Sequence, residues 1–203
     1  LFPSGVEPEH YAAARSARTP KDRPVAGYVG VIDERIDVTL LAGLAATLPD
    51  WDIHVVGPVV KIDLESLPSA PNLFYPGPVP YTELPSIMAG FDVGLMPFAL
   101  NEATRSISPT KTLEYLAAGL PVVSTRVPDV VADYDGIVDL ADDAAGFATA
   151  CRQRRTGLDE LGAARVEAVL RQQHWDSIAA RMDELITADA GAAASADREE
   201  ETA

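Results

Sequence analysis

Short apolar segments alternate with segments of helical periodicity along most of the chain, and this alternation constrains the fold more than any other feature of the sequence. The strand-like segments are nearly continuous apolar runs, as expected for strands buried on both faces of a sheet. They lie at 25–33, 51–58, 71–80, 92–98, 121–125 and 136–141. Helical segments lie at 36–50, 81–91, 109–118, 142–155, 159–173 and 175–187. The sequence therefore predicts an α/β fold with a doubly wound parallel sheet of about six strands.

The two ends of the chain differ in composition from this central part. Residues 1–24 are rich in proline, alanine and charge, and predict a linker with one short helical turn. Residues 25–187 are predicted to form one folded domain, and the hydrophobic content of 47% is enough for its core. Residues 188–203 carry no large apolar side chain, so we expect a disordered acidic tail.

The charge of the chain narrows the classes of partner. The 203 residues carry a formal net charge of −15, which argues against a nucleic-acid partner because phosphate backbones attract basic surfaces. The negative net charge does not exclude a small ligand that carries phosphate, since such a ligand needs only a local positive pocket. No apolar run reaches the roughly 18 residues that a membrane span needs. The single cysteine, Cys151, excludes an intramolecular disulfide and is expected to be a buried thiol.

The helical segment that begins near Ser108 has the composition of an anion site. Ser108 is a good N-cap and Pro109 suits the first helical position, so the free amides of this turn could receive a phosphate. Lys111 could add a full charge, and Glu114 shares its helix face and could accept the hydroxyl groups of a ribose. The alternative is that Lys111 and Glu114 form an ordinary surface ion pair, and this segment alone leaves both readings open.

A wider set of segments resembles one known family. "EYLAAGLPVVST" resembles the glutamate-containing block of retaining glycosyltransferases with the GT-B fold, of the group 1 or family 4 type. "PSGVEPEHY", "LPSAPNLFYPGPVPYTELPSIMAGFDVGLMPF" and "QQHWDSIAARMDEL" resemble other segments of the same family in the same order. The resemblance covers residues 1–187 and implies a Rossmann-like sheet, the C-terminal, donor-binding half of the fold. The chain begins without Met, and we expect residues 1–24 to be the linker from an N-terminal domain that is absent from it.

The resemblance assigns roles around the helix that starts near Ser108. Glu114 falls on the family's ribose-binding glutamate, whereas Ser106 falls where the family has an earlier glutamate; Glu102 lies nearby but out of register. The turn before Glu114 offers backbone amides to the sugar and diphosphate in the family. Here Pro109 has no amide to give, so Ser108, Thr110 and Lys111 are the candidates.

The first loop departs from the family pattern in its cations. Val31 occupies the position of the usual arginine, and Arg35 is expected to take the role of the following lysine. Lys111 could supply the charge that is missing at Val31, and Arg105 is a further candidate. Asp33 and Asp37 flank Arg35 and could pin it or act near the sugar, or serve as loop and N-cap residues.

The loop after the third strand is the expected nucleobase contact. The backbone of Val79 could read the base edge and Tyr81 could stack on it, or the segment 77–81 could be only a rigid connection. Gly30 lets the first loop approach a diphosphate closely, unless it is simply a turn glycine.

Neither a metal nor a bound cofactor is expected. His10, His54 and His174 are scattered without ligand spacing and are predicted to be structural. "GYVGVID" is not a dinucleotide fingerprint, which disfavours a nicotinamide-dependent enzyme. The resemblance also implies catalysis that uses cations and a helix end.

The function implied by the resemblance is binding of a nucleoside diphosphate sugar by a retaining hexosyltransferase that acts on a glycan or lipid-linked acceptor. Arg35 and Lys111 would assist departure of the diphosphate, and the isolated domain is expected to be inactive without its N-terminal partner. The alternative is a nucleotide-binding or scaffold module of the same fold that has lost catalysis. Polysaccharide biosynthesis, a cytoplasmic location and peripheral association of the full-length enzyme with the plasma membrane are expected from resemblance only.

Overall fold

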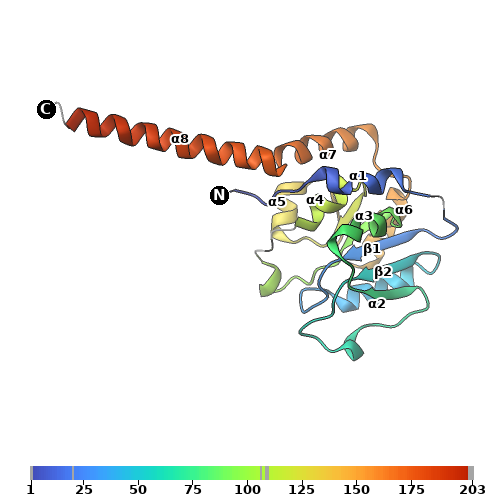
Figure 1. Cartoon of the computed structure of the whole chain (residues 1–203). Helices are drawn as coiled ribbons and strands as arrows, with labels where there is room; N and C mark the ends of the chain where they lie inside the picture. Colours follow the sequence, from blue (N-terminus) through green and yellow to red (C-terminus); the bar gives the residue numbers. More distant parts are fainter. Residues whose placement is uncertain (1, 20, 106, 108–109, 201–203) are drawn as a thin grey trace.

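The computed structural model describes residues 2–19, 21–105, 107 and 110–200, and gives residues 189–200 as backbone only (Figure 1). The elements in chain order are α1 (Pro8–Ser16), β1 (Val25–Val29), α2 (Val38–Thr47), β2 (Asp52–Val56), η1 (Leu64–Ser66), β3 (Leu73–Gly77), η2 (Tyr81–Glu83), α3 (Leu84–Ala89), β4 (Val93–Met96), η3 (Glu102–Thr104), α4 (Thr110–Ala117), β5 (Val122–Ser124), α5 (Pro128–Tyr134), β6 (Asp139–Leu140), α6 (Ala144–Arg154), α7 (Glu160–Gln172) and α8 (Trp175–Glu200).

Within the described residues, six strands form one sheet in the order β3-β2-β1-β4-β5-β6, and all neighbouring strands are parallel. The central strands β1 and β4 are buried along their whole length, which explains their continuous apolar sequence. The chain builds outward from β1 to β3 and then returns to place β4 on the other side of β1. The predicted doubly wound parallel sheet is confirmed, and its topological switch point lies between β1 and β4.

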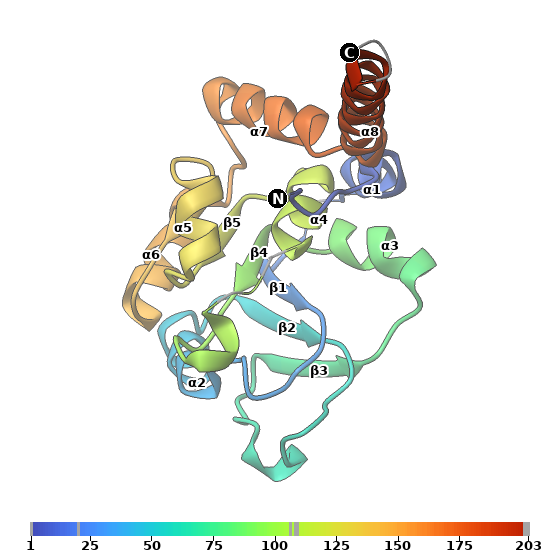
Figure 2. The same cartoon turned by 90° about the vertical axis from the view of Figure 1, so that its left-hand side faces the viewer.

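Helices cover both faces of the sheet. α2 packs against α6 on one face, while α3 and α4 lie on the other face and α1 packs across both of them (Figure 2). The core between these layers contains large side chains that are completely buried, among them Trp51, Tyr28, Phe91, Tyr115 and Phe147. The fold therefore leaves the carboxyl ends of the strands, and the loops that follow them, as the edge where a ligand can bind.

Two terminal segments are more ordered than the sequence predicts. Instead of a single helical turn, α1 spans Pro8–Ser16, because Pro8 suits the first turn and because Tyr11 and Ala14 are buried against α3 and α4. The predicted disordered tail is helical through Glu200, as part of α8, which projects from the body in Figure 1. The tail is rich in alanine, the strongest helix former, so a lack of large apolar side chains did not prevent a helix.

No described helix is both long enough and apolar enough to cross a membrane.

Candidate functional site

The loop after β1 leaves the sheet at the switch point. The sequence predicts a strand that continues to Asp33, but β1 ends at Val29 because Gly30 has a φ of 151°, which side-chain-bearing residues rarely adopt. The amide of Gly30 donates to the carbonyl of Val56 at 2.8 Å, so the loop starts from a fixed point beside β2. The predicted close approach of a diphosphate to Gly30 stays a prediction, because side chains from Lys111 and Tyr28 lie beside this backbone.

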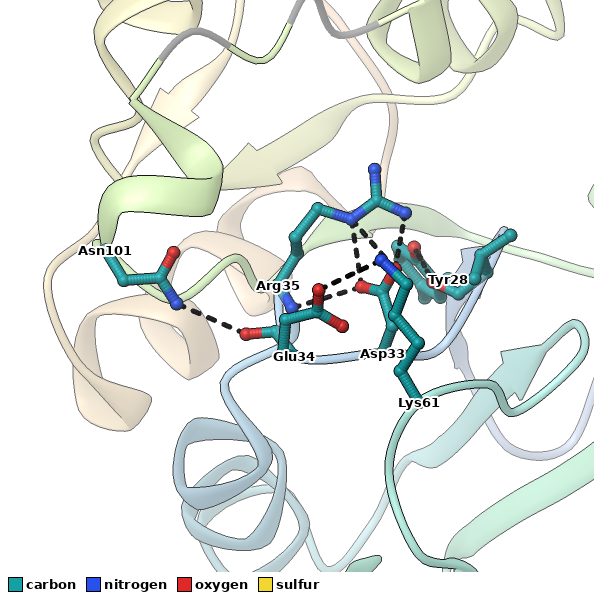
Figure 3. Close-up of polar contacts among 7 residues, drawn as sticks. Tyr28, Asp33, Glu34, Arg35, Lys61 and Asn101 are labelled. Atoms are coloured by element: carbon teal, nitrogen blue, oxygen red, sulfur yellow. Dashed lines mark hydrogen bonds and ion pairs between the residues drawn. The ribbon is translucent and has the colours of Figure 1, made fainter.

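Asp33 and Arg35 form an ion pair inside this loop (Figure 3). The Nε of Arg35 donates to both carboxylate oxygens at 2.9 and 3.0 Å, and its Nη2 donates to Oδ2 at 2.7 Å. Burial raises the pKa of Asp33, but the hydrogen bonds and charge of Arg35 outweigh burial and bring it below its ordinary value. Asp33 therefore pins Arg35 and offsets its charge. Asp37 has a different task, since its side chain accepts the amide of Leu40 as the N-cap of α2.

Two further contacts tie this loop to its neighbours. Lys61, in the loop after β2, donates to Glu34 at 3.2 Å, and the side-chain amide of Asn101 donates to the carbonyl of Glu34 at 3.2 Å (Figure 3). The ion pair is exposed and contributes little stability, but the three loops converge at one edge of the sheet.

Lys111 lies against the same edge, from the first turn of α4. Its side chain extends across Gly30, where a Cβ would overlap Cε of the lysine, and its Nζ lies 5.9 Å from the centre of the Tyr28 ring. Burial lowers the pKa of Lys111; the charge of Arg35 acts in the same direction, while those of Glu114 and Asp33 oppose it. The structure thus brings together Lys111 and Gly30, two predicted site residues from distant segments.

A pocket adjoins this edge, on the side of α4 where Glu114 lies. Its volume is about 390 Å³, and it is lined by Gly5, Val6, Glu7, Tyr11, Tyr81, Thr110, Glu114 and Trp175. We call it the α1–α4 pocket. Three predicted site residues, Tyr81, Thr110 and Glu114, therefore line a single concave surface. Lys111 and Glu114 form no salt bridge, which disfavours the surface ion pair: Lys111 lies across Gly30, whereas Glu114 lines the pocket.

Tyr81 already has one aromatic partner. Its ring stacks on that of His10 with centroids 4.2 Å apart and planes 2° apart, and His10 Nε2 lies 3.2 Å from the Tyr81 carbonyl oxygen. Half of the Tyr81 residue surface, 54%, is exposed, so it can still offer surface to a base. Val79 is partly buried against the core and is not among the lining residues. Its predicted contact with a base stays a prediction.

Some predicted residues cannot be placed. Ser106, Ser108 and Pro109 lie outside the described residues, so the proposed cap and the departure from the family glutamate have no structural description. Arg105 and Glu102 do lie within them. They form an exposed ion pair at 3.5 Å on η3, which favours a solvated role for Arg105.

Two larger cavities lie elsewhere, and the arginine side chains that line them already form hydrogen bonds or an ion pair. One of about 620 Å³ lies between α1 and α7, where Arg15 and Arg18 donate to the last carbonyl groups of α4. Another, of about 690 Å³, contains Arg23, which is paired with Asp52 at 2.8 Å. These arginines cap a helix or close an ion pair, so the edge at the carboxyl ends of the strands remains the candidate site.

The histidines are held by structural contacts. His174 lies 3.3 Å from a carboxylate oxygen of Glu9, and His54 contacts the edge of Phe74. Over the described part of the chain, His, Cys, Asp and Glu side chains form no group of three or more that could hold a metal ion.

Sequence reasoning missed five of the residues that line the α1–α4 pocket, and the two aromatic ones are the largest of them. Tyr11 and Trp175 both line it, and both lie in segments that were read only as a family resemblance at the two ends of the domain. Trp175 covers Gly5 so closely that a Cβ at Gly5 would overlap its ring. A glycine followed six residues later by a tyrosine was the available signal, but only the fold shows that both segments meet α4.

Comparison with known proteins identifies the family of the chain. Residues 23–154 match the family described as "Glycosyl transferases group 1". The chain is 32% identical over 133 residues to the putative teichuronic acid biosynthesis glycosyltransferase TuaH of Bacillus subtilis, covering 62% of this chain and 34% of TuaH.

Two solved structures share the fold at low identity. Sucrose-phosphate synthase from Thermosynechococcus elongatus aligns with a TM-score of 0.68 and 21% identity, over 95% of this chain and 53% of that one. Anabaena HepE in complex with UDP-glucose aligns with a TM-score of 0.66 and 14% identity, over 91% of this chain and 56% of that one. The chain thus spans about a third of its curated relative and about half of these solved chains. With its Rossmann-like sheet and the family match over residues 23–154, the chain belongs to the group 1 glycosyltransferases.

Proposed function

We propose that this chain binds the nucleoside diphosphate sugar of a retaining glycosyltransferase that transfers a hexosyl group to a glycan or lipid-linked acceptor. One observation carries the proposal. α4 presents Lys111 over Gly30 at the switch point and Glu114 in the adjoining α1–α4 pocket, so one helix offers a cation and a carboxylate to neighbouring parts of one ligand. The UDP-glucose complex of Anabaena HepE, which shares the fold, supports this class of donor.

The charge arrangement suits departure of a diphosphate. Lys111 would neutralise the negative charge that develops on the leaving group, and the amides of Thr110 and Lys111, at the start of α4, would add hydrogen-bond donors. Because Lys111 is partly buried, its attraction for phosphate is screened less than that of a fully exposed lysine. No metal is assigned to this step, and the cations of the chain are proposed to carry it.

The remaining groups divide the rest of the donor between them. Glu114 would accept hydrogen bonds from the ribose hydroxyl groups, and the exposed surface of Tyr81 would contact the base. Arg35 would assist only in part, because Asp33 offsets its charge. The acceptor and any catalytic base would come from a second domain, and the isolated chain would bind nucleotide without efficient turnover.

A binding experiment tests this proposal. Thermal unfolding of the chain should shift upward with UDP or GDP, since a ligand that binds only the folded state stabilises it by mass action. Lys111→Glu should abolish the shift, because it places a negative charge beside the diphosphate. The matched control is Arg171→Glu on α7, which makes the same change of charge at a side chain that is 72% exposed. An unchanged shift in Lys111→Glu would contradict the proposed site.

A second candidate is a nucleotide-binding or scaffold module without catalysis. The observation that favours it is the neutralised Arg35, together with Val31 in place of the usual arginine, which leaves the first loop with a net negative charge. The full-length protein separates the two. Hydrolysis or transfer of the sugar from the nucleotide that the chain binds would exclude the inactive module, and binding without either would favour it.

The proposal extends to the pathway and the cellular location of the full-length protein. The name of the Bacillus subtilis relative connects that protein to teichuronic acid biosynthesis. We propose a role in polysaccharide assembly at the cytoplasmic side of the membrane, with peripheral association of the full-length enzyme.

A further inference from the structure

Tyr11 is a buried tyrosine with an unsatisfied hydroxyl. It lies on α1 with only 1% of its surface exposed, and its ring makes edge contacts with His10 and Tyr81 at centroid distances of 4.8 and 6.3 Å. Among the described residues, its hydroxyl oxygen is buried and has no hydrogen-bond partner. The ring of Tyr11 would pack equally well without its hydroxyl group, so packing alone does not explain why this residue is a tyrosine.

Such a group is costly unless it serves a purpose. A buried hydroxyl without a partner costs about 1–3 kcal/mol, and phenylalanine would fill almost the same volume without that cost. Buried polar atoms in native structures are nearly always paired, so each exception calls for an explanation. The other buried tyrosines make the contrast clear: Tyr28 donates to Val31, and Tyr115 accepts from the amide of Val29.

The surroundings of the hydroxyl indicate its partner. Tyr11 and Glu114 both line the α1–α4 pocket, where α1 packs against α4. Burial raises the pKa of Tyr11 well above its ordinary value, and the negative charge of Glu114 and the nearby side chains of Tyr81 and Glu114 act in the same direction. The phenol therefore stays protonated and can only donate to a carboxylate that comes within reach.

We propose that Tyr11 is a positioning residue for Glu114: its hydroxyl donates a hydrogen bond to the Glu114 carboxylate when that carboxylate turns to bind the ribose hydroxyl groups. This inference rests on the proposed function, because it takes Glu114 as a ligand-binding group. The Tyr11 hydroxyl is itself shielded from solvent, so it acts through Glu114 and does not contact the ligand. The cost of the unpaired hydroxyl in the free protein is then recovered on binding.

This role predicts two effects of opposite sign for Tyr11→Phe. The free chain should gain stability, with Tm rising by about 2–4 °C, because the variant removes an unsatisfied polar atom and keeps the ring. Affinity for the nucleoside diphosphate should fall about fivefold, which corresponds to the loss of one hydrogen bond. A purely structural tyrosine would not couple higher stability to weaker binding.

The matched control is Tyr75→Phe. The Tyr75 hydroxyl donates to the carbonyl of Pro68 at 3.1 Å, and neither residue lines the α1–α4 pocket. Its removal deletes a satisfied hydrogen bond, so the Tm should fall and nucleotide affinity should not change.

A double-mutant cycle shows whether Tyr11 acts through Glu114. UDP and GDP are titrated calorimetrically into the wild-type chain, Tyr11→Phe, Glu114→Gln and the double variant. Once Glu114 is replaced, adding Tyr11→Phe should change the affinity less than twofold. Equal losses in both backgrounds would mean direct contact with the ligand and would overturn the proposal, as would wild-type affinity in Tyr11→Phe. If the wild-type chain binds neither nucleotide, the proposed function itself fails, and the role of Tyr11 fails with it.

Discussion

Asp33 and Arg35, two residues apart in the loop after β1, form a bidentate ion pair in which the carboxylate is almost completely buried. The loop that should supply a cation to an anionic ligand therefore also supplies the counter-ion. Lys111, by contrast, makes no ion pair within the described part of the chain. Of these two predicted cations, Arg35 is held in an ion pair, whereas Lys111 has no ion-pair partner among the described residues and can bind an anionic ligand.

Asp33→Asn should strengthen diphosphate binding while it weakens the fold. The amide cannot offset the charge of Arg35, so we expect the affinity for UDP or GDP to rise about three- to tenfold, as measured by calorimetry. The free energy of unfolding should fall by about 1–3 kcal/mol because a buried, charge-assisted contact is lost. Asp142→Asn is the control, since its pair with Arg126 is exposed and should matter for neither quantity. Unchanged or weaker binding by Asp33→Asn would show that Arg35 does not face the ligand.

The Asp33 carboxylate should also give the fold a defined acid sensitivity. Its pKa is lower in the folded state than in the unfolded chain, so its contribution to stability is complete above about pH 4 and is lost as the pH falls through the folded-state pKa. The difference in unfolding free energy between the wild type and Asp33→Asn should therefore be constant from pH 7 to 5 and shrink below pH 4. Urea titrations across this range measure it, and a difference that grows on acidification would contradict the assignment.

Lys111→Met should stabilise the free chain and weaken nucleotide binding. Burial lowers the pKa of Lys111, so the charged form is disfavoured in the fold, and an apolar side chain of similar length should raise the Tm by about 2–4 °C near neutral pH. This gain should disappear as the pH rises toward about 10.4, where the lysine is neutral in both states. Affinity for UDP or GDP should fall roughly tenfold or more, while Arg171→Met, on exposed α7, should leave it unchanged. Equal affinity in Lys111→Met would remove the lysine from the phosphate site.

Gly30→Ala should damage both stability and binding. With a φ of 151°, the position strains any residue that has a side chain, and the added Cβ would displace Lys111 from its place across the loop. Gly157→Ala is the matched control, because its φ is 89° but no atom lies within 4 Å of an added Cβ. Both variants should lose about 1 kcal/mol of stability, and only Gly30→Ala should lose nucleotide affinity. Loss of affinity in both would indicate a global effect of destabilisation.

Cys151 should be inert in the native protein. The thiol is buried in α6, and burial, with the charge of Asp139 next, raises its pKa to about 12. At pH 8 the native chain should react with a disulfide reagent on the order of a thousand times more slowly than the chain unfolded in guanidinium chloride, because only the thiolate reacts. Similar rates in the two conditions would mean that α6 opens readily.

The sequence was sufficient for the sheet and for the helix that carries the site. Continuous apolar strands and a helix closed by Gly119 could be read directly, because burial on both faces and the left-handed φ of 70° at Gly119 leave clear local patterns. The short helix α5 was missed, since Pro128–Tyr134 is brief and has no apolar repeat long enough to recognise. Its position depends on packing against the rest of the domain.

The site was only partly predictable for a related reason. Gly30, Lys111 and Glu114 could be named because a turn glycine and the first turn of a helix have their own sequence signals. The partnership of Asp33 with Arg35, the stacking of His10 on Tyr81 and the burial of Tyr11 depend on contacts that no local pattern specifies. The sequence pattern identified the charged residues, but only the three-dimensional structure shows which of them are neutralised by a partner.

The two ends of the domain are joined beside the pocket. The amide of Val6 donates to the carbonyl of Gln173 at 2.9 Å, and the amide of Trp175 donates to the carbonyl of Val6 at 3.3 Å. Removing the first seven residues would delete part of a wall of the α1–α4 pocket, and it would remove the backbone contacts of Val6 that hold the start of α8. A recombinant form of this domain should therefore retain the segment around Val6. An affinity tag is better placed after Glu200 than close to Gly5.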